Sequence, residues 1–168
     1  MGKVKRAIII ERTTIEKVQE TVSNLSDEAL TIDFDEFFSK QPEICEFVTE
    51  LMSESGQQAR DLCLFLSYLV YKAAVEATSV HELPTNAKTI TEAYKESRLW
   101  IDKMSGLSEV EIDRLTVSGQ DGQFHLLGFV IGEINMAIAE GLTLNEQEQG
   151  KMLFILKTVI SSLTWNKS

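Results

Sequence analysis

The sequence predicts an all-α protein, folded as a single-domain bundle of five to six helices with a short N-terminal arm. Apolar residues recur at helical spacing along most of the 168 residues. Only two prolines and nine glycines interrupt the chain, which favours long helices over many short strands. The composition is 43% hydrophobic and 25% charged, which is typical of a globular domain and not of a disordered chain.

The N-terminal arm is defined by its charge. Residues 1–12 hold four basic groups and one acidic group, and the stretch that follows is strongly acidic. We expect the arm to be a flexible lead-in or a strap over that acidic region. The chain is therefore divided into a basic arm, 1–12, and a helical bundle domain, 13–168.

Capping residues and prolines indicate where the helices of the domain begin. Thr13 with Glu16 forms a capping box before the first helix, and Pro42 occupies the first position of another. The long helices are followed by loops rich in glycine, proline or polar residues. The expected elements are a helix over 13–25, a short turn capped by Asp33 or Asp35 over 33–38, helices over 42–52, 55–78 and from after Pro84 to 104, a short helix over 108–115, a loop over 118–122, and helices over 123–140 and 143–165.

Three of these helices carry apolar side chains on two sides, judged at 100° per residue. One central helix can be surrounded within a small bundle, but three helices compete for that place. At about 25 cal/mol per Å2, exposing even two large aromatic side chains forfeits several kcal/mol of burial. We therefore expect the second sides to contact a partner or a ligand. Their residues are Tyr68, Tyr71, Phe129, Met136, Phe154 and Trp165.

The 123–140 helix also carries a strip of small residues, Gly128, Gly132, Asn135 and Ala139. A glycine in a helix interior costs up to about 1 kcal/mol, so the strip predicts a packing reason, the close approach of another backbone. The segment is too short, and too polar at Glu133, for this pattern to be that of a membrane helix.

Charge and cysteine content restrict the classes of partner and compartment. The formal charge of −10 opposes binding to a nucleic-acid backbone, because there is no net positive field to release counterions. Cys45 and Cys63 are expected to be reduced core thiols of a cytoplasmic protein. No unbroken apolar run is longer than the one over 62–66, so no membrane span is expected.

Residues that could carry catalysis are sparse. The sequence has no phosphate-binding loop, no Gly-x-Ser-x-Gly and no His-Glu-x-x-His, so no catalytic residue, metal site or cofactor is predicted. The two histidines, at positions 81 and 125, are expected to be structural or solvated. Glu43, Glu46 and Glu50 resemble the Glu-x-x-Glu magnesium pattern of all-helical nucleotide pyrophosphatases, and Asp61 is the acid available on the next helix.

The function expected from these observations is a non-enzymatic protein-interaction or regulatory module that self-associates through apolar helix faces. A second copy of the chain is the first expected partner, as a homodimer, and another protein is the second. Two alternatives stay open. One is a helical bundle that binds a small apolar ligand, and the other is a magnesium-dependent hydrolase that uses the acids of the 42–52 helix.

Overall fold

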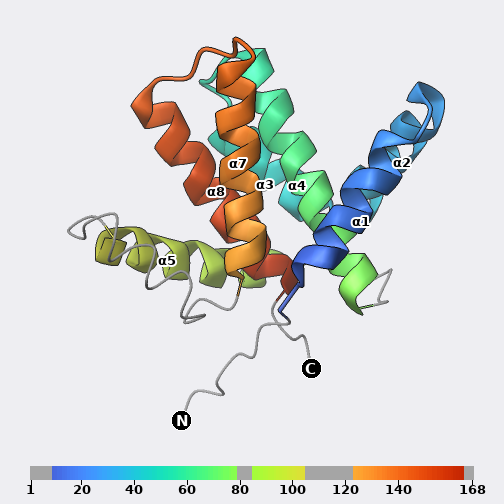
Figure 1. Cartoon of the computed structure of the whole chain (residues 1–168). Coiled ribbons are helices and arrows are strands. Elements are labelled where there is room, and N and C mark those ends of the chain that lie inside the picture. The colour runs from blue at the N-terminus through green and yellow to red at the C-terminus, as the bar shows by residue number, and fades with distance from the viewer. Residues whose placement is uncertain (1–8, 79–84, 105–122, 165–168) are drawn as a thin grey trace.

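The computed structural model describes residues 9–78, 85–104 and 123–164, and this part of the chain is all-helical, without strands (Figure 1). It is 84% helical. It contains seven helices, where the sequence analysis expected five to six. They are α1 (Arg12–Ser23), α2 (Asp27–Lys40), α3 (Pro42–Leu51), α4 (Gln57–Thr78), α5 (Ala87–Met104), α7 (Phe124–Ala139) and α8 (Glu146–Thr164). The expected helix over 108–115 and loop over 118–122 lie outside the described residues.

The largest local correction concerns α2, which is a full helix and not a short turn. Ser26 is its N-cap, since the serine oxygen accepts a hydrogen bond from the backbone N–H of Ala29 at 3.1 Å. Asp27 and Glu28 follow in the first turn, where carboxylates interact favourably with the helix dipole. The expectation of a cap at Asp33 or Asp35 therefore missed the first half of the helix.

Two other helix starts also differ from the expected caps. α1 begins at Arg12, ahead of the capping box expected at Thr13. α8 is capped by Asn145, whose side-chain oxygen accepts from the N–H of Glu148 at 2.8 Å, while the Glu148 carboxylate accepts from the N–H of Asn145 at 3.4 Å. This is a reciprocal capping arrangement, displaced by two residues from the expected pair. α3 does begin with Pro42, as predicted.

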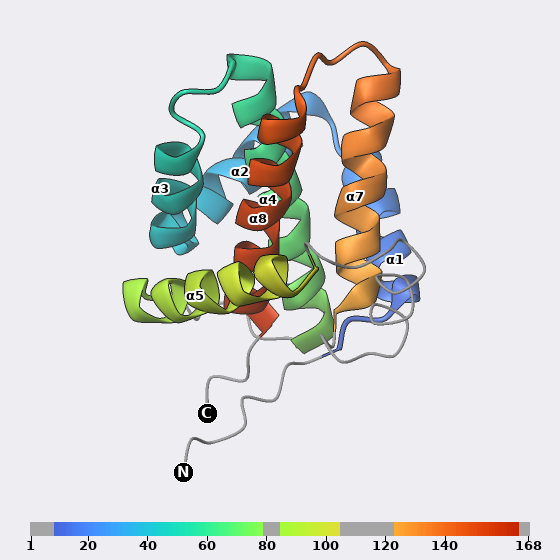
Figure 2. The ribbon, with the colours of Figure 1, turned by 90° about the vertical axis from the view of Figure 1, so that its left-hand side faces the viewer.

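α4 and α8 form the centre of the bundle. α4 contacts α1, α2, α3 and α8, and α8 contacts α3, α4, α5 and α7. α5 lies across one end of the upright helices, and α7 stands at an edge of the bundle next to α1 (Figure 2). The core follows the central pair, where Leu66, Val70, Leu156 and Ile160 have no exposed surface.

Both cysteines belong to this core and neither forms a disulfide. Their relative exposure is 4% for Cys45 and none for Cys63. Desolvation by burial raises the pKa of both thiols to about 12. They therefore remain protonated and poorly reactive at neutral pH.

The end of the predicted N-terminal arm is attached to the bundle. Ile10 is 1% exposed, and its N–H donates to the side-chain oxygen of Gln123 at 3.2 Å. Ile15, Val18 and Val22 of α1 are also buried. Residues 1–8 of the predicted arm lie outside the described part of the chain. Within that part, none of the helices has the length and apolar character needed to cross a membrane.

Candidate functional site: the outer face of α7 and the adjoining pocket

Among the residues that the structure describes, α7 is covered on one side only. Leu126, Leu127, Val130 and Ile134 are buried against the bundle. The exposed residues recur every three or four positions and form one continuous stripe, which we call the outer face of α7. Its residues are Gly128, Ile131, Gly132, Asn135, Met136 and Ala139. Ile131, a large apolar residue, is 37% exposed on this face.

The two glycines confirm that this face is open within the described chain. A methyl group added at Gly128 or Gly132 would have no neighbouring atom within 4 Å. Ile131 and Met136, which is 54% exposed, border the stripe on opposite sides. Among the described residues, the other exposed large apolar side chains occur at position 9 and on α2 and α5. The outer face of α7 is therefore an uncovered apolar strip with small residues along its middle.

Charged groups lie at the two ends of this face and not along it. Arg12 and Glu16 form an ion pair at the N-terminal end of α7, where Glu11 also lies 4.0 Å from the His125 ring, and Glu140 follows the C-terminus. Glu133 lies on the side of α7 that faces α1, where its carboxylate accepts a hydrogen bond from the Gln19 amide at 3.2 Å. Desolvation, together with the negative charge of Glu140, raises the pKa of Glu133.

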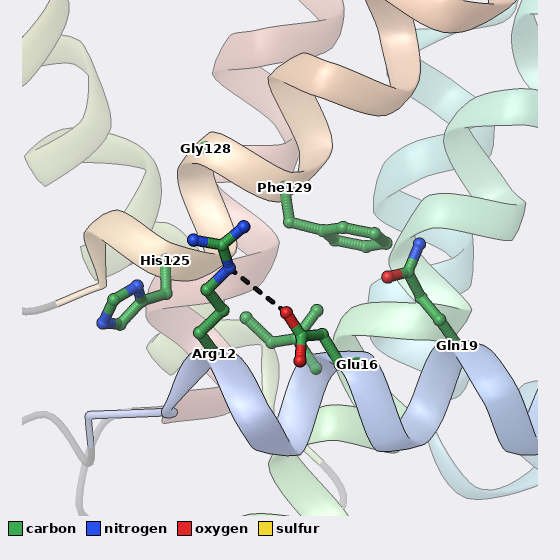
Figure 3. Close-up of a pocket in the computed structure, with 7 residues that line it drawn as sticks. Arg12, Glu16, Gln19, His125, Gly128 and Phe129 are labelled. Atoms are coloured by element: carbon green, nitrogen blue, oxygen red, sulfur yellow. Dashed lines mark ion pairs between the residues drawn. The ribbon is translucent and has the colours of Figure 1, made fainter.

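A pocket of about 340 Å3 separates α1 from α7 (Figure 3). The lining residues are Arg12, Ile15, Glu16 and Gln19 from α1, and His125, Gly128 and Phe129 from α7. The four residues from α1 share one face of that helix, because the last three lie three, four and seven positions after Arg12.

Ile15 and the half-buried Phe129 supply the apolar part of the pocket, while Arg12 forms an ion pair with Glu16 at 3.2 Å. Gly128 belongs both to the pocket and to the outer face of α7. The pocket therefore opens directly beside the uncovered strip.

Two of the six predicted contact residues lie at this site. Met136 is exposed on the outer face of α7. Phe129 lines the α1–α7 pocket (Figure 3). These two residues lie on the same side of α7, seven positions apart.

Tyr68 and Tyr71 are placed elsewhere, in the core, with exposures of 0% and 8%. α2 covers them. The rings of Phe34 and Tyr68 are 5.0 Å apart, and those of Phe37 and Tyr71 are 5.2 Å apart. The expectation that this face meets a partner is corrected here, because the longer α2 already buries it within one chain.

Below these rings a polar network joins α2 to α4. The Tyr68 hydroxyl donates to the carboxylate of Asp33, and the Lys72 ammonium lies 3.1 Å from the same carboxylate. Burial, with the hydrogen bond and the charge of Asp33, raises the pKa of Tyr68, so the phenol remains a donor at neutral pH.

Phe154 is half-buried and packs edge-on against Tyr94 of α5, with ring centroids 4.8 Å apart. It therefore belongs to the α5–α8 contact. Trp165 lies outside the described residues. The six predicted residues do not form one surface.

The acids of the hydrolase alternative do not converge. Glu43, Glu46 and Glu50 are exposed on α3, and Asp61 lines a different pocket of about 210 Å3 between α3 and α4. Over the residues that the structure describes, no three histidine, cysteine, aspartate or glutamate side chains come close enough to hold a metal ion.

The polar half of the α1–α7 pocket has no motif in the sequence. Arg12 belongs to the predicted arm, His125 is expected to be structural or solvated, and Gln19 is part of no motif. The only available signal was their spacing, since Arg12, Ile15 and Gln19 share one face of α1. That α7 lies opposite this face follows from the tertiary structure.

No protein-family model matches the chain, and comparisons with curated proteins and with solved structures find no significant similarity. The class that the fold and the site define is therefore structural: over its described residues, an all-helical protein in which the outer face of α7 is uncovered beside a pocket of mixed polarity.

Proposed function

We propose that this chain is a protein-interaction module that self-associates through the outer face of α7. The observation that carries the proposal is the pair of exposed glycines inside this helix. Each glycine costs up to about 1 kcal/mol of helix stability, and neither meets another part of the described chain that would justify its lack of a side chain. A second backbone packed closely on the same face would require residues without side chains at both positions.

The residues around the glycines support the same proposal. The face has no charged side chain, although the chain as a whole carries a formal charge of −10. Ile131 and Met136 add apolar surface whose burial would stabilise a complex at about 25 cal/mol per Å2. Methionine also adapts its shape to a partner more readily than a branched side chain does.

The test is a measurement of solution mass by sedimentation or light scattering. The parent protein is expected to dimerise, and Met136→Asp is expected to shift it toward monomer because a carboxylate would be desolvated in the interface. Leu99→Asp is the matched control, since Leu99 is a 71% exposed residue of α5, away from this face, and should leave the mass unchanged. A parent protein that stays monomeric at every accessible concentration would overturn the proposal.

The α1–α7 pocket favours a second candidate, the binding of a small molecule. Its volume is at the lower end of the range for ligand sites, and its lining combines apolar and polar groups. Native mass spectrometry of freshly purified protein would separate the two candidates. A retained small-molecule mass supports the ligand, whereas a dimer without additional mass supports self-association.

A further inference from the structure

We infer that the second copy binds with its α7 antiparallel to the first, centred on Gly132, so that the partner's Met136 enters the α1–α7 pocket beside Gly128. This inference rests on the proposed self-association and specifies its register.

The register follows from the spacing along α7. Gly128 and Met136 are each four residues from Gly132, about 6 Å along the helix axis on opposite sides. A two-fold axis through Gly132 therefore brings Gly128 of one copy level with the partner's Met136, and the reverse contact forms at the same time. This reciprocity is what a symmetric dimer requires.

The position of the pocket around the helix fits the same arrangement. Met136 and Phe129 are seven residues apart, so they lie on the same side of α7. A two-fold axis perpendicular to the helices keeps that side facing the corresponding side of the partner. The partner's Met136 would thus meet Phe129 and the space beside Gly128, where an added methyl group would find no atom of the described chain within 4 Å. On the other side of the face, Ile131 would meet the partner's Ile131.

Shape and chemistry are complementary at this contact. Met136 is the more exposed of the two large apolar residues on the outer face, at 54% against 37% for Ile131. The pocket offers the apolar surfaces of Ile15 and Phe129. A thioether sulfur packs favourably against an aromatic ring, so Phe129 suits a methionine in particular.

The charges at the ends of α7 favour the antiparallel over the parallel arrangement. Glu140 is eight residues beyond Gly132, so antiparallel pairing brings the partner's Glu140 level with the first turn of α7. Arg12 stands there with an 80% exposed side chain, beside the carboxylates of Glu16 and Glu11. Its contact with Glu16 uses only part of the five donors of a guanidinium. Parallel pairing would instead bring the two Glu140 carboxylates level with each other at the C-terminal end.

Disulfide trapping tests the register. Gly128→Cys and Met136→Cys are prepared as separate, differently tagged proteins, mixed and mildly oxidised. Because a disulfide needs Cα atoms within about 7 Å, we expect a 128–136 crosslink in the mixture and far less crosslinking of either variant alone. The buried Cys45 and Cys63 give little background, and Leu99→Cys is the control for an exposed thiol outside the interface.

Each other outcome contradicts a defined part of the inference. Efficient crosslinking of each variant with itself indicates a parallel pair, which overturns the register and leaves self-association in place. A dimer that gives no crosslink at either position uses another face, and it overturns the register together with the assignment to α7. A monomeric parent overturns both the register and the proposed function.

Charge exchange tests the contact between Arg12 and the partner's Glu140 separately. Arg12→Glu and Glu140→Arg are each expected to raise the dimer dissociation constant about tenfold, because symmetry places this exposed contact twice in the dimer. The double variant is expected to recover most of the loss. Lys88→Glu, an exposed reversal on α5, is the control for net charge. Losses that simply add in the double variant would contradict the contact.

Discussion

α7 and α8 have the same apolar two-sided pattern in the sequence, yet the structure covers them differently. Ten of the 19 residues of α8 are buried, and its second side packs under α5 through Phe154 and Tyr94. The second side of α7 has no such cover within the described chain. An apolar second side is therefore not by itself a sign of a partner, because a neighbouring helix of the same chain can provide the cover.

The covered helix even buries polar groups. Lys157 of α8 is 4% exposed, lies 5.7 Å from the ring centre of Trp100, and donates to the Ser161 hydroxyl at 3.1 Å. The Thr158 hydroxyl lies 3.0 Å from that of Ser97 on α5. These contacts satisfy polar atoms that would otherwise destabilise the interior. They show that α5 is an integral cover of α8.

The largest expected effect on stability distinguishes the covered helix α8 from the outer face of α7. Ile160→Ala on α8 is expected to lower the free energy of unfolding by about 2–4 kcal/mol, because it removes a fully buried side chain and leaves a cavity. Ile131→Ala makes the same chemical change on the outer face of α7 and should cost less than about 1 kcal/mol in the monomer. Denaturant unfolding at low protein concentration measures both, and equal losses would contradict the comparison.

A smaller effect is expected where α2 covers α4. Tyr68→Phe removes the hydroxyl that donates to Asp33 and should cost about 1–2 kcal/mol, since the half-buried carboxylate loses a partner. Asp33→Asn keeps an acceptor for Tyr68 and is expected to cost less than Asp33→Ala. The same unfolding measurement checks all three. If Tyr68→Phe is neutral, the network does not hold α2 in place.

Substitution of Gly132, at the centre of the outer face, should have opposite effects on monomer stability and on dimerisation. Gly132→Ala is expected to raise the stability of the monomer by about 0.5–1 kcal/mol, because alanine favours the helix and its methyl group meets no neighbour. The same change should weaken dimerisation by holding the two backbones apart. Unfolding at low concentration and sedimentation at high concentration measure the two effects. A variant that is stabilised and dimerises unchanged would argue against a close approach at Gly132.

The smallest expected effect is the pH dependence that Glu133 gives to the free energy of unfolding. A raised pKa means that folded Glu133 keeps its proton at pH values just above the ordinary 4.5, where the unfolded chain has already lost it. This contribution to stability is thus full below pH 4.5 and is lost as the pH rises through the pKa of the folded state.

Glu133→Gln removes this loss and keeps an oxygen that can accept from Gln19. We expect the variant to be more stable than the parent at pH 7 by less than about 1 kcal/mol, because the group is partly exposed and screened by solvent. The difference should vanish near pH 4, as followed by thermal unfolding. Glu54→Gln, an exposed acid after α3, controls for the change in net charge. A gain that is independent of pH would rule out the desolvation of Glu133 as its cause.

The sequence by itself determined the all-helical class, the position of α3 and the burial of both cysteines, because helical periodicity and proline placement are local properties. It also predicted Phe129 and Met136 on the second side of one helix and, separately, a strip of small residues on the same helix. It underestimated α2, because Asp33 and Asp35 are also good capping residues and their local signal competes with that of Ser26.

The tertiary structure alone decided which apolar sides remain open. α2 covers Tyr68 and Tyr71 and α5 covers Phe154, while α7 stands at the edge of the bundle with its second side uncovered by any described residue. The pocket beside Gly128 likewise exists only because α1, more than a hundred residues earlier in the chain, lies next to α7. The periodicity of a helix shows which of its sides are apolar, but the choice of neighbour depends on how all the helices share one core.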